Sequence, residues 1–411
     1  MNSRKIVLIG KVFPEPVSSA AGTRMLQLIH LFQEFNWEVI FASSAQPTAY
    51  SDPLQDRQIE CIPIKLNHSS FQTTLNNIQP DVVLFDRFMT EEQFGWRVDE
   101  SIPDALKILD TEDLHGLRSG RQSAVKEGRV FRESDLLNPQ SYREIASLLR
   151  CDVSLIISEY ELNLLESFFK VPSYLLYYLP LFVAKDRLGP SLIPFNQRRH
   201  LVTIGNFLHP PNRDAVHQLR KVYWPGIRSE IPDAELHIYG AYANTNDIML
   251  NNPDEGFYMK GRAEEAISTL ERYRVLLAPL RFGAGLKGKV LDSMQAGTPV
   301  GTTHIGAEGI SGTHPFLGFV EDDRNTFIAQ AIRLYKDETQ WKQAQTNGYT
   351  ILRDRFNSDI HKKAFMDGIE ALLSNRELHR KKNFTGAMLK HHSLASTKFM
   401  GRWIEEKNRT S

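Results

Sequence analysis

The chain has 411 residues, which is long enough for two globular domains with sizeable cores. Hydrophobic residues make up 41% of the chain, charged residues 24%, and the formal net charge is zero, which argues against a general nucleic-acid binder. Two cysteines cannot build a disulfide framework, and no segment approaches the roughly 20 apolar residues that span a bilayer. We therefore expect a two-domain protein of the cytoplasm.

The first half of the chain alternates strand-like and helix-like segments. An apolar run at 5–9 is too short for a signal sequence, so it predicts a first buried strand, which ends at Gly10. A helical period follows in Met25, Leu28, Ile29, Leu31 and Phe32. Further candidate strands lie at 39–42, 59–64, 82–85, 105–109 and 153–157. This alternation predicts a parallel sheet with helices on both faces.

The pattern breaks near the middle of the chain and then restarts. Residues 177–190 contain two prolines and a glycine, which predicts an interdomain linker. Candidate strands then lie at 200–204, 235–239, 274–278 and 299–302, with candidate helices at 214–228, 264–271 and 286–295. The sequence thus predicts an α/β fold of two Rossmann-like, doubly wound domains. Because ligands of open α/β sheets bind beyond the carboxyl ends of the strands, we expect the site in the cleft between the domains.

The last part of the chain is predicted to be helical and ends in a basic tail. Helical patterns cover 324–335, 338–354 and 361–373. The tail, 376–411, still carries Phe399, Met400, Trp403 and Ile404, so its last turns can dock on the body of the protein. Its positive charge leaves open a peripheral contact with the inner face of an anionic membrane, although basic tails are more often only solvated.

The most informative segment is 279–300, in which a glycine-rich turn lies between a predicted strand and a predicted helix. A strand, such a turn and a helix N-terminus together form a ready site for a phosphate. Gly283 and Gly285 allow the backbone to approach a ligand closely. The simpler alternative is a solvated basic turn, because a glycine-rich turn alone is weak evidence.

Charged residues of the same segment strengthen the phosphate hypothesis. Arg281, Lys287 and Lys289 bring three cations to the turn, and Asp292 follows one helical turn later, where it can bind a ribose. A cation near a helix N-terminus is unfavourable unless an anion also binds there, so Lys287 and Lys289 themselves favour a bound phosphate.

Residues 278–309, from Ala278-Pro-Leu-Arg to Gly306-Ala-Glu-Gly309, resemble the donor-site region of retaining GT-B glycosyltransferases of family 4. Most of that family has two acids spaced as residues 284 and 292 are, and the second acid holds the ribose of the nucleotide. Asp292 matches the second acid, whereas the first position is Ala284. We expect Glu308, which follows the strand at 299–302, to contact the sugar hydroxyls and partly replace the missing acid.

The resemblance implies a GT-B fold with a C-terminal helix that crosses back to the first domain. The expected parts are a first domain at 1–183, completed by a helix at about 356–375, a donor domain at 184–355, and the tail. The implied reaction transfers a sugar, as hexosyltransferases do, from a nucleoside-diphosphate sugar to a hydroxyl of a sugar, a lipid-linked carrier or a protein. It implies retention at the anomeric carbon and neither metal nor cofactor, and no cluster with metal-ligand spacing is evident in the sequence.

A second part of the donor site is expected in the loop Gly205-Asn-Phe-Leu-His-Pro-Pro-Asn212, which resembles the loop after the first strand of the family's second domain. The family usually has an arginine and a lysine there, but this chain has Asn206 and Asn212. We therefore assign the diphosphate to Arg281 and Lys287, with Gly205, His209 and Asn212 as further donor contacts. Alternatively, His209 and Asn212 only hold the loop and cap the next helix.

Two segments of the first domain are candidate parts of the site. Residues 18–24 resemble the family's loop between the first strand and the first helix, so Gly22 and Arg24 are expected to face a phosphate or the acceptor, unless this is an ordinary connection. His115 lies just beyond the strand 105–109, in a region where the family carries a functional histidine. We predict that His115, with Lys287 and Arg281, serves catalysis, although a lone histidine is more often structural.

Rival functions stay open on the same residues. The loss of an acid at Ala284 permits a catalytically inactive protein that only binds nucleotide sugars, and the two-domain architecture also suits an epimerase or a phosphorylase. A Rossmann dehydrogenase is disfavoured because Gly10-Lys-Val-Phe-Pro lacks the pattern Gly-x-Gly-x-x-Gly after the first strand.

Overall fold

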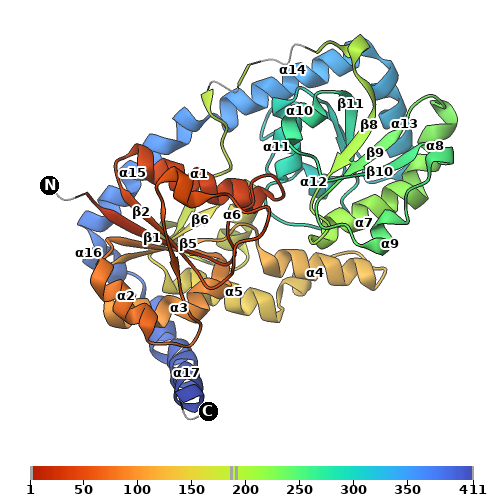
Figure 1. Ribbon diagram of the computed structural model, residues 1–411. Helices are drawn as coiled ribbons and strands as arrows, with labels where there is room; N and C mark the ends of the chain where they lie inside the picture. The colour runs from red at the N-terminus through yellow and green to blue at the C-terminus, as the bar shows by residue number, and fades with distance from the viewer. Residues whose placement is uncertain (1–2, 186–187, 190–192, 410–411) are drawn as a thin grey trace.

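The computed structural model describes residues 3–185, 188–189 and 193–409. It contains two sheets of seven and six strands, in which the strands pair in parallel, with helices around them (Figure 1). The predicted α/β fold of two doubly wound domains is therefore confirmed.

The first domain has the strand order β3-β2-β1-β4-β5-β6-β7. Its strands are β1 (Lys5–Gly10), β2 (Glu38–Ser43), β3 (Glu60–Pro63), β4 (Val82–Asp86), β5 (Leu106–Asp110), β6 (Val153–Ile156) and β7 (Leu176–Tyr178). Its helices are α1 (Ala20–Glu34), α2 (Ser70–Ile78), α3 (Arg87–Ser101), α4 (His115–Lys126), α5 (Pro139–Arg150) and α6 (Glu159–Ser167). Alternate residues of β1 enter different apolar clusters: Ile6 and Leu8 lie in one, and Val7 and Ile9 in the other. Both faces of the sheet are therefore covered.

The second domain repeats this plan with the strand order β10-β9-β8-β11-β12-β13. Its strands are β8 (Arg199–Ile204), β9 (Leu236–Tyr239), β10 (Phe257–Gly261), β11 (Tyr273–Ala278), β12 (Val300–Thr302) and β13 (Gly318–Val320). Its helices are α7 (Pro210–Gln218), α8 (Trp224–Glu230), α9 (Thr245–Ile248), α10 (Ala266–Leu270), α11 (Gly288–Gln295), α12 (His304–Ala307), α13 (Arg324–Lys336) and α14 (Glu338–Arg355). The strand order reverses between β8 and β11, as it does between β1 and β4, and such reversal points are where α/β sheets bind ligands.

The chain returns to the first domain through its C-terminal helices. At the crossing, Val183 forms a parallel bridge with Asn357. Helix α15 (Ser358–Ser374) then places Phe365, Met366 and Ile369 in an apolar cluster of the first domain. Figure 1 shows α14 and α15 as a blue path over both domains.

The tail is a docked helical extension. After α16 (Arg376–Lys381), the 26-residue helix α17 (Phe384–Arg409) packs on α3 and α5 and projects to the C-terminus, as Figure 1 shows. Basic side chains of the tail pair with acids of the first domain: Arg376 and Arg380 of α16 with Asp104 and Asp152, and Lys398 of α17 with Glu100. Within the described ranges, no helix combines the length and the apolar character that crossing a membrane requires.

Two details differ from the sequence prediction. The helix expected from 214 begins four residues earlier, because Pro210 and Pro211 occupy its first positions, where a missing N–H costs nothing. It is also interrupted by a π-helical turn at Leu219–Tyr223 before α8 begins. The strands β7, β10 and β13 were not predicted; all three lie at sheet edges, and β7 and β13 have only three residues each.

Candidate active site

The N-termini of helices from both domains lie close together where the two domains are in contact. Helix α1 begins at Ala20 and α11 at Gly288, and a Cβ added at Gly288 would lie 2.6 Å from the Cβ of Ala20. The helices α4 and α7 also start there, with His115 and His209 at or just before their first residues. Because a helix N-terminus carries partial positive charge and free N–H groups, this arrangement favours an anion in the cleft.

The glycine-rich turn of the second domain is pressed against the first domain. Gly285 has a φ of +63°, and a Cβ added to it would lie 2.8 Å from the Cβ of Asp113, so glycine is needed for both the backbone and the contact. Ala284, the position of the missing acid, is only 8% exposed and lies in an apolar cluster of the first domain. The turn is therefore part of the domain interface.

Lys287 is buried in this interface. Its ammonium donates to the carbonyl oxygen of Gly285 at 2.8 Å and lies 3.6 Å from a carboxylate oxygen of Glu308. The pKa of Lys287 is lowered by burial, although the Glu308 carboxylate opposes this shift. Glu308 itself forms a two-pronged ion pair with Arg121 of α4, at 2.8 and 2.5 Å. Lys287 and Glu308, which the sequence analysis assigns to the donor site, thus lie close together in the structure. Glu308 is already paired with Arg121.

Arg281 does not join Lys287. Its guanidinium is paired with the carboxylate of Asp214 on α7, with its Nε 2.9 Å from the carboxylate, and its side chain is 42% exposed. The expectation that Arg281 and Lys287 together hold a diphosphate stays a prediction, and it requires Arg281 to leave Asp214.

The loop before α7 is held by Asn212. Its Nδ2 donates to the carbonyl oxygen of Asn206, and its Oδ1 accepts from the ammonium of Lys289 at 2.9 Å. A Cβ added at Gly205 would lie 2.7 Å from the Asn212 side chain, so the glycine makes room for it. Asn212 therefore holds the loop and also positions Lys289. Burial lowers the pKa of Lys289 to about 8.

His115 and His209 approach one another from opposite domains, around Asp113. The Nδ1 atom of His115 lies 3.7 Å from a carboxylate oxygen of Asp113, which also pairs with Arg118. Burial lowers the pKa of His209 to about 4, although Asp113 opposes the shift. Burial alone would raise the pKa of Asp113, but Arg118, His115 and His209 hold it well below its usual range. His209 is thus neutral at pH 7 and Asp113 is ionised.

Asp292 lies on α11, as the sequence predicts. It is half-buried, and burial together with the neighbouring Glu265 raises the pKa of its carboxyl to about 7, with Lys289 opposing the shift. Glu265 caps the preceding helix, α10, by accepting from the backbone N–H groups of Ile267 and Ser268. A carboxyl group that is neither fully protonated nor fully ionised near pH 7 can both donate a hydrogen bond to a ribose hydroxyl and accept one.

Two candidates of the first domain have structural roles instead. Arg24 is completely buried: it pairs with Asp110 and donates to the carbonyl oxygen of Pro180, so it cannot reach a phosphate or an acceptor. A Cβ at Gly22 would come within 2.3 Å of the Glu15 backbone, so this glycine lets the preceding loop pack on α1. The expectation that Gly22 and Arg24 face a ligand is corrected, because both are covered by the domain's own chain.

The structure adds three residues that were not predicted as site residues: Asp113, Arg121 and Glu161. Asp113 and Arg121 flank His115 closely in the sequence, and their charge was the only signal available there. Glu161, on α6, is 1% exposed and accepts from the backbone N–H groups of Leu114 and Gly285. These partners lie 47 and 124 residues away, so local sequence patterns could not reveal them.

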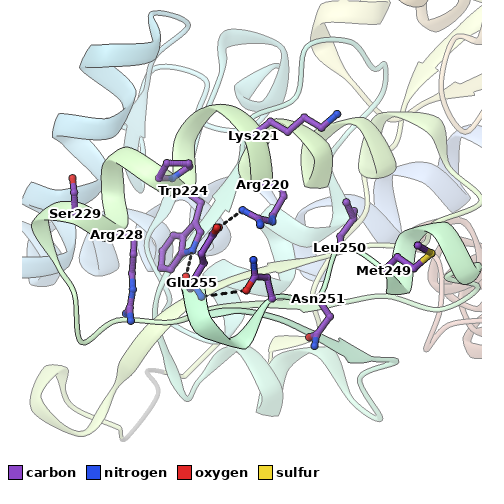
Figure 2. Close-up of a pocket in the computed structure, with 11 residues that line it drawn as sticks. Arg220, Lys221, Trp224, Arg228, Ser229, Met249, Leu250, Asn251 and Glu255 are labelled. Atoms are coloured by element: carbon purple, nitrogen blue, oxygen red, sulfur yellow. Dashed lines mark hydrogen bonds and ion pairs between the residues drawn. The ribbon is translucent and has the colours of Figure 1, made fainter.

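A surface hollow of about 760 Å³ lies elsewhere, on the outer side of the second domain. Figure 2 shows Arg220 directed at Glu255, whose carbonyl oxygen accepts from the indole of Trp224. Glu255 precedes β10, so this hollow lies at the amino ends of the strands, opposite the edge where such sheets bind ligands. The candidate site between the domains is therefore separate from this hollow. Over the ranges that the structure describes, no group of three or more His, Cys, Asp or Glu side chains is arranged to hold a metal ion.

The family match covers the part of the second domain that contains the glycine-rich turn before α11. Residues 198–337 match the family described as Glycosyl transferases group 1. The chain is 25% identical over 174 residues to an uncharacterized 44.6 kDa protein in the cps region of Klebsiella pneumoniae, an alignment that covers 40% of this chain and 44% of that protein. The chain thus spans less than half the length of this curated relative.

Solved structures share the fold over almost the whole chain. Sucrose-phosphate synthase from Thermosynechococcus elongatus superposes with a TM-score of 0.69 at 15% identity, over 90% of this chain and 99% of that chain. Anabaena HepE in complex with UDP and glucose superposes with a TM-score of 0.67 at 12% identity, over 90% and 100%. Residues 198–337 are therefore a glycosyl transferases group 1 domain, within a chain whose two domains form the GT-B fold.

Proposed function

We propose that this protein transfers a hexosyl group from a nucleoside-diphosphate sugar to a hydroxyl acceptor, with retention of the anomeric configuration and without a metal. The observation that carries the proposal is the glycine-rich turn before α11. There a helix N-terminus, Lys287 and Lys289 lie together at the interface with the first domain. A diphosphate fits this combination of charge and N–H groups.

In this proposal the second domain binds the donor. Lys287 and the N-terminus of α11 neutralise the diphosphate, Lys289 and Asn212 border it, and Asp292 binds the ribose. His209 and Glu308 lie toward the transferred sugar. Cations and helix dipoles placed in advance stabilise the charge that develops on the departing diphosphate, which is the electrostatic part of catalysis.

The first domain binds the acceptor in this proposal. His115, beside Asp113 and Glu144, faces the donor half of the cleft and orients the acceptor hydroxyl. The bond from the anomeric carbon to the diphosphate oxygen breaks as the bond to the acceptor oxygen forms on the same face. The acceptor proton moves to the departing phosphate oxygen, so no enzymic nucleophile is needed.

The relatives support specific substrates. Because one structural neighbour was solved with UDP and glucose, we propose UDP-linked hexoses as the first donors to test. The relative from a cps region supports a saccharide acceptor of polysaccharide biosynthesis, ahead of a lipid-linked or protein hydroxyl.

A donor panel tests the proposal. The protein is incubated with UDP-, GDP- and ADP-linked hexoses, each with and without a mixture of oligosaccharide acceptors, and free nucleotide and labelled glycan are measured. We expect nucleotide release that depends on the acceptor and labels it. Donor binding without turnover would favour the inactive binding protein, and a changed sugar on an intact donor would favour an epimerase.

A peripheral membrane contact stays a separate prediction. The outward side of α17 carries Phe399, Met400 and Trp403, which are more than half exposed, whereas Arg376, Arg380 and Lys398 are used in pairs with the first domain. Flotation with anionic liposomes, for the full chain and for Trp403→Ser, measures this contact. Equal flotation of the two proteins would argue against α17 as the contact.

A further inference from the structure

Three successive residues of the glycine-rich turn in the second domain, 283–285, contact residues of the first domain. The Gly283 carbonyl oxygen accepts from the guanidinium of Arg121 at 2.8 Å. Ala284 lies in an apolar cluster of the first domain, and the Gly285 N–H donates to Glu161 at 2.8 Å. Residues of α4 and α6 therefore hold the segment 283–285.

Glu161 links this turn to the acceptor side. One oxygen of its buried carboxyl accepts from the N–H of Leu114, 2.9 Å away, as well as from Gly285. Leu114 directly precedes His115, and Gly285 lies two residues before Lys287. One carboxyl group thus fixes the backbone of both candidate half-sites. Its second oxygen, Oε2, is buried and has no hydrogen-bond partner.

Arg121 makes a second link of the same kind. Besides the Gly283 carbonyl, its guanidinium holds the Glu308 carboxylate with two contacts, and its side chain is 5% exposed. Breaking such a pair leaves an uncompensated buried charge, which is strongly unfavourable. Because the partners belong to different domains, separating the domains costs both this pair and the Glu161 hydrogen bond to Gly285.

We propose that Arg121 and Glu161 are positioning residues that lock the two domains around the donor turn, so that the donor half-site takes its binding shape only when the domains are closed. Neither residue needs to touch the substrate. They act through the backbone of 283–285 and through Glu308. This inference deepens the proposed function, because it names what aligns the two half-sites on which that function rests.

The lock also explains alanine at position 284. A carboxylate there would be buried in an apolar cluster, next to a turn that already faces Glu161 and Asp113. Burial of a further carboxyl costs free energy, and burial already raises the pKa of Glu161 to about 8. An acid at 284 is therefore unfavourable beside Glu161 in this interface.

Small-angle X-ray scattering of the unliganded full chain tests the lock, with variants Glu161→Ala, Glu161→Gln, Arg121→Ala and Arg121→Lys. The matched control is Glu144→Ala, because Glu144 is also buried and also accepts from two backbone N–H groups, those of His115 and Gly116, but within the first domain. We expect a larger radius of gyration for both alanine variants, intermediate values for Gln and Lys, and the wild-type value for Glu144→Ala.

Isothermal titration calorimetry with UDP as the probe measures the second effect of the lock, the affinity of the donor half-site. Burial raises the pKa of Glu161 to about 8, so Glu161→Ala loses hydrogen bonds to a largely neutral carboxyl and should weaken UDP binding by up to about tenfold. Arg121→Ala, which also leaves Glu308 without its cation, should weaken UDP binding by about tenfold or more. The variant Ala284→Glu should weaken UDP binding, and Ala284→Glu combined with Glu161→Gln should recover at least part of it, since one buried ionisable carboxyl is then removed beside the other.

The outcomes separate the lock from the proposed function. If no donor is turned over by the wild type but scattering and UDP binding change as expected, the lock holds and the proposed activity fails. If Glu161→Ala and Arg121→Ala unfold at lower temperature but scatter and bind UDP as the wild type does, they are merely structural and the inference is wrong. Additive effects of Ala284→Glu and Glu161→Gln would also overturn it.

Discussion

Arg24 of α1 and Asp110 at the end of β5 form an ion pair whose two side chains are 1% and 0% exposed. Removal of one partner of a buried pair costs about 3–5 kcal/mol, because the other charge stays buried without compensation. We therefore expect Arg24→Ala to lose about that much unfolding free energy in urea. Lys342→Ala, which removes an exposed pair with Glu338, should lose less than about 1 kcal/mol. Equal losses in the two variants would show that the Arg24 pair contributes little.

Lys287→Ala should weaken the binding of UDP by roughly 10- to 100-fold, since a hydrogen bond to a charged group contributes about 1.5–3 kcal/mol. Isothermal titration calorimetry measures the change. Lys221→Ala is the control, because Lys221 borders the hollow on the outer side of the second domain. Unchanged affinity in Lys287→Ala would overturn the assignment of the diphosphate to the turn before α11.

Gly285→Ala should destabilise the closed arrangement through its contact with Asp113. The control is Gly128→Ala: Gly128 has a similar φ, +67° against +63°, but nothing lies within 4 Å of the added Cβ. Both variants therefore share the backbone strain of about 1 kcal/mol, and only Gly285→Ala also meets the first domain. We expect a clearly lower melting temperature and weaker UDP binding in Gly285→Ala. Indistinguishable variants would contradict the close approach to Asp113.

Asp292 should make the protein less stable as the pH rises through about 7. The pKa of its carboxyl is raised to about 7 by burial and Glu265, whereas an aspartate of the unfolded chain titrates near 4. The folded state therefore favours the protonated carboxyl, and this contribution is complete below about pH 4 and lost as the pH rises through about 7. An asparagine at 292 cannot ionise, so the Asp292→Asn variant does not lose this stability as the pH rises. The melting temperature of the variant should therefore exceed that of the wild type by more at pH 8.5 than at pH 5. An equal difference at both values would argue against the raised pKa.

His115→Ala should lower kcat with the best donor and acceptor by about 10²-fold or more, the usual contribution of a positioned histidine. The backbone of His115 is held by Glu144, so the helix start does not depend on the imidazole. We expect the melting temperature and UDP affinity to stay near the wild-type values. His68→Ala, at an exposed histidine of the first domain, controls for general effects. A kcat within a factor of about two of the wild type would remove His115 from the catalytic candidates.

Most of the fold was predictable because it depends on local patterns. Apolar runs such as 5–9 and 82–85, flanked by glycines and polar residues, predicted β1 and β4 closely, and repeated alternation predicted two parallel sheets. Strand β13 (Gly318–Val320), which has three residues and lies at a sheet edge, was not predicted. The sequence predicted α17 only as part of a basic tail, since pairs such as Lys398 with Glu100 join residues that are far apart in the sequence.

The candidate site was predictable only in part. The turn at Gly283 and Gly285, and the charges of Lys287 and Asp292, are visible in one continuous segment, and the structure places that segment at the cleft. Arg24 shows the limit, because an arginine that faces a ligand and one that is buried against Asp110 look alike in a sequence. Arg281 shows it again, since its partner Asp214 lies on a different element.

The sequence by itself determined the order and type of most elements and the chemistry of the donor turn, because hydrophobic periodicity and glycine positions act over a few residues. Only the tertiary structure decided which charged side chains are paired within the protein and which can bind a ligand. Arg121 with Glu308, Glu161 with Gly285, and Arg24 with Asp110 are contacts between distant segments, and burial sets their strength. The partner of a charged side chain is a property of the fold, so it appears only when the two domains are in place.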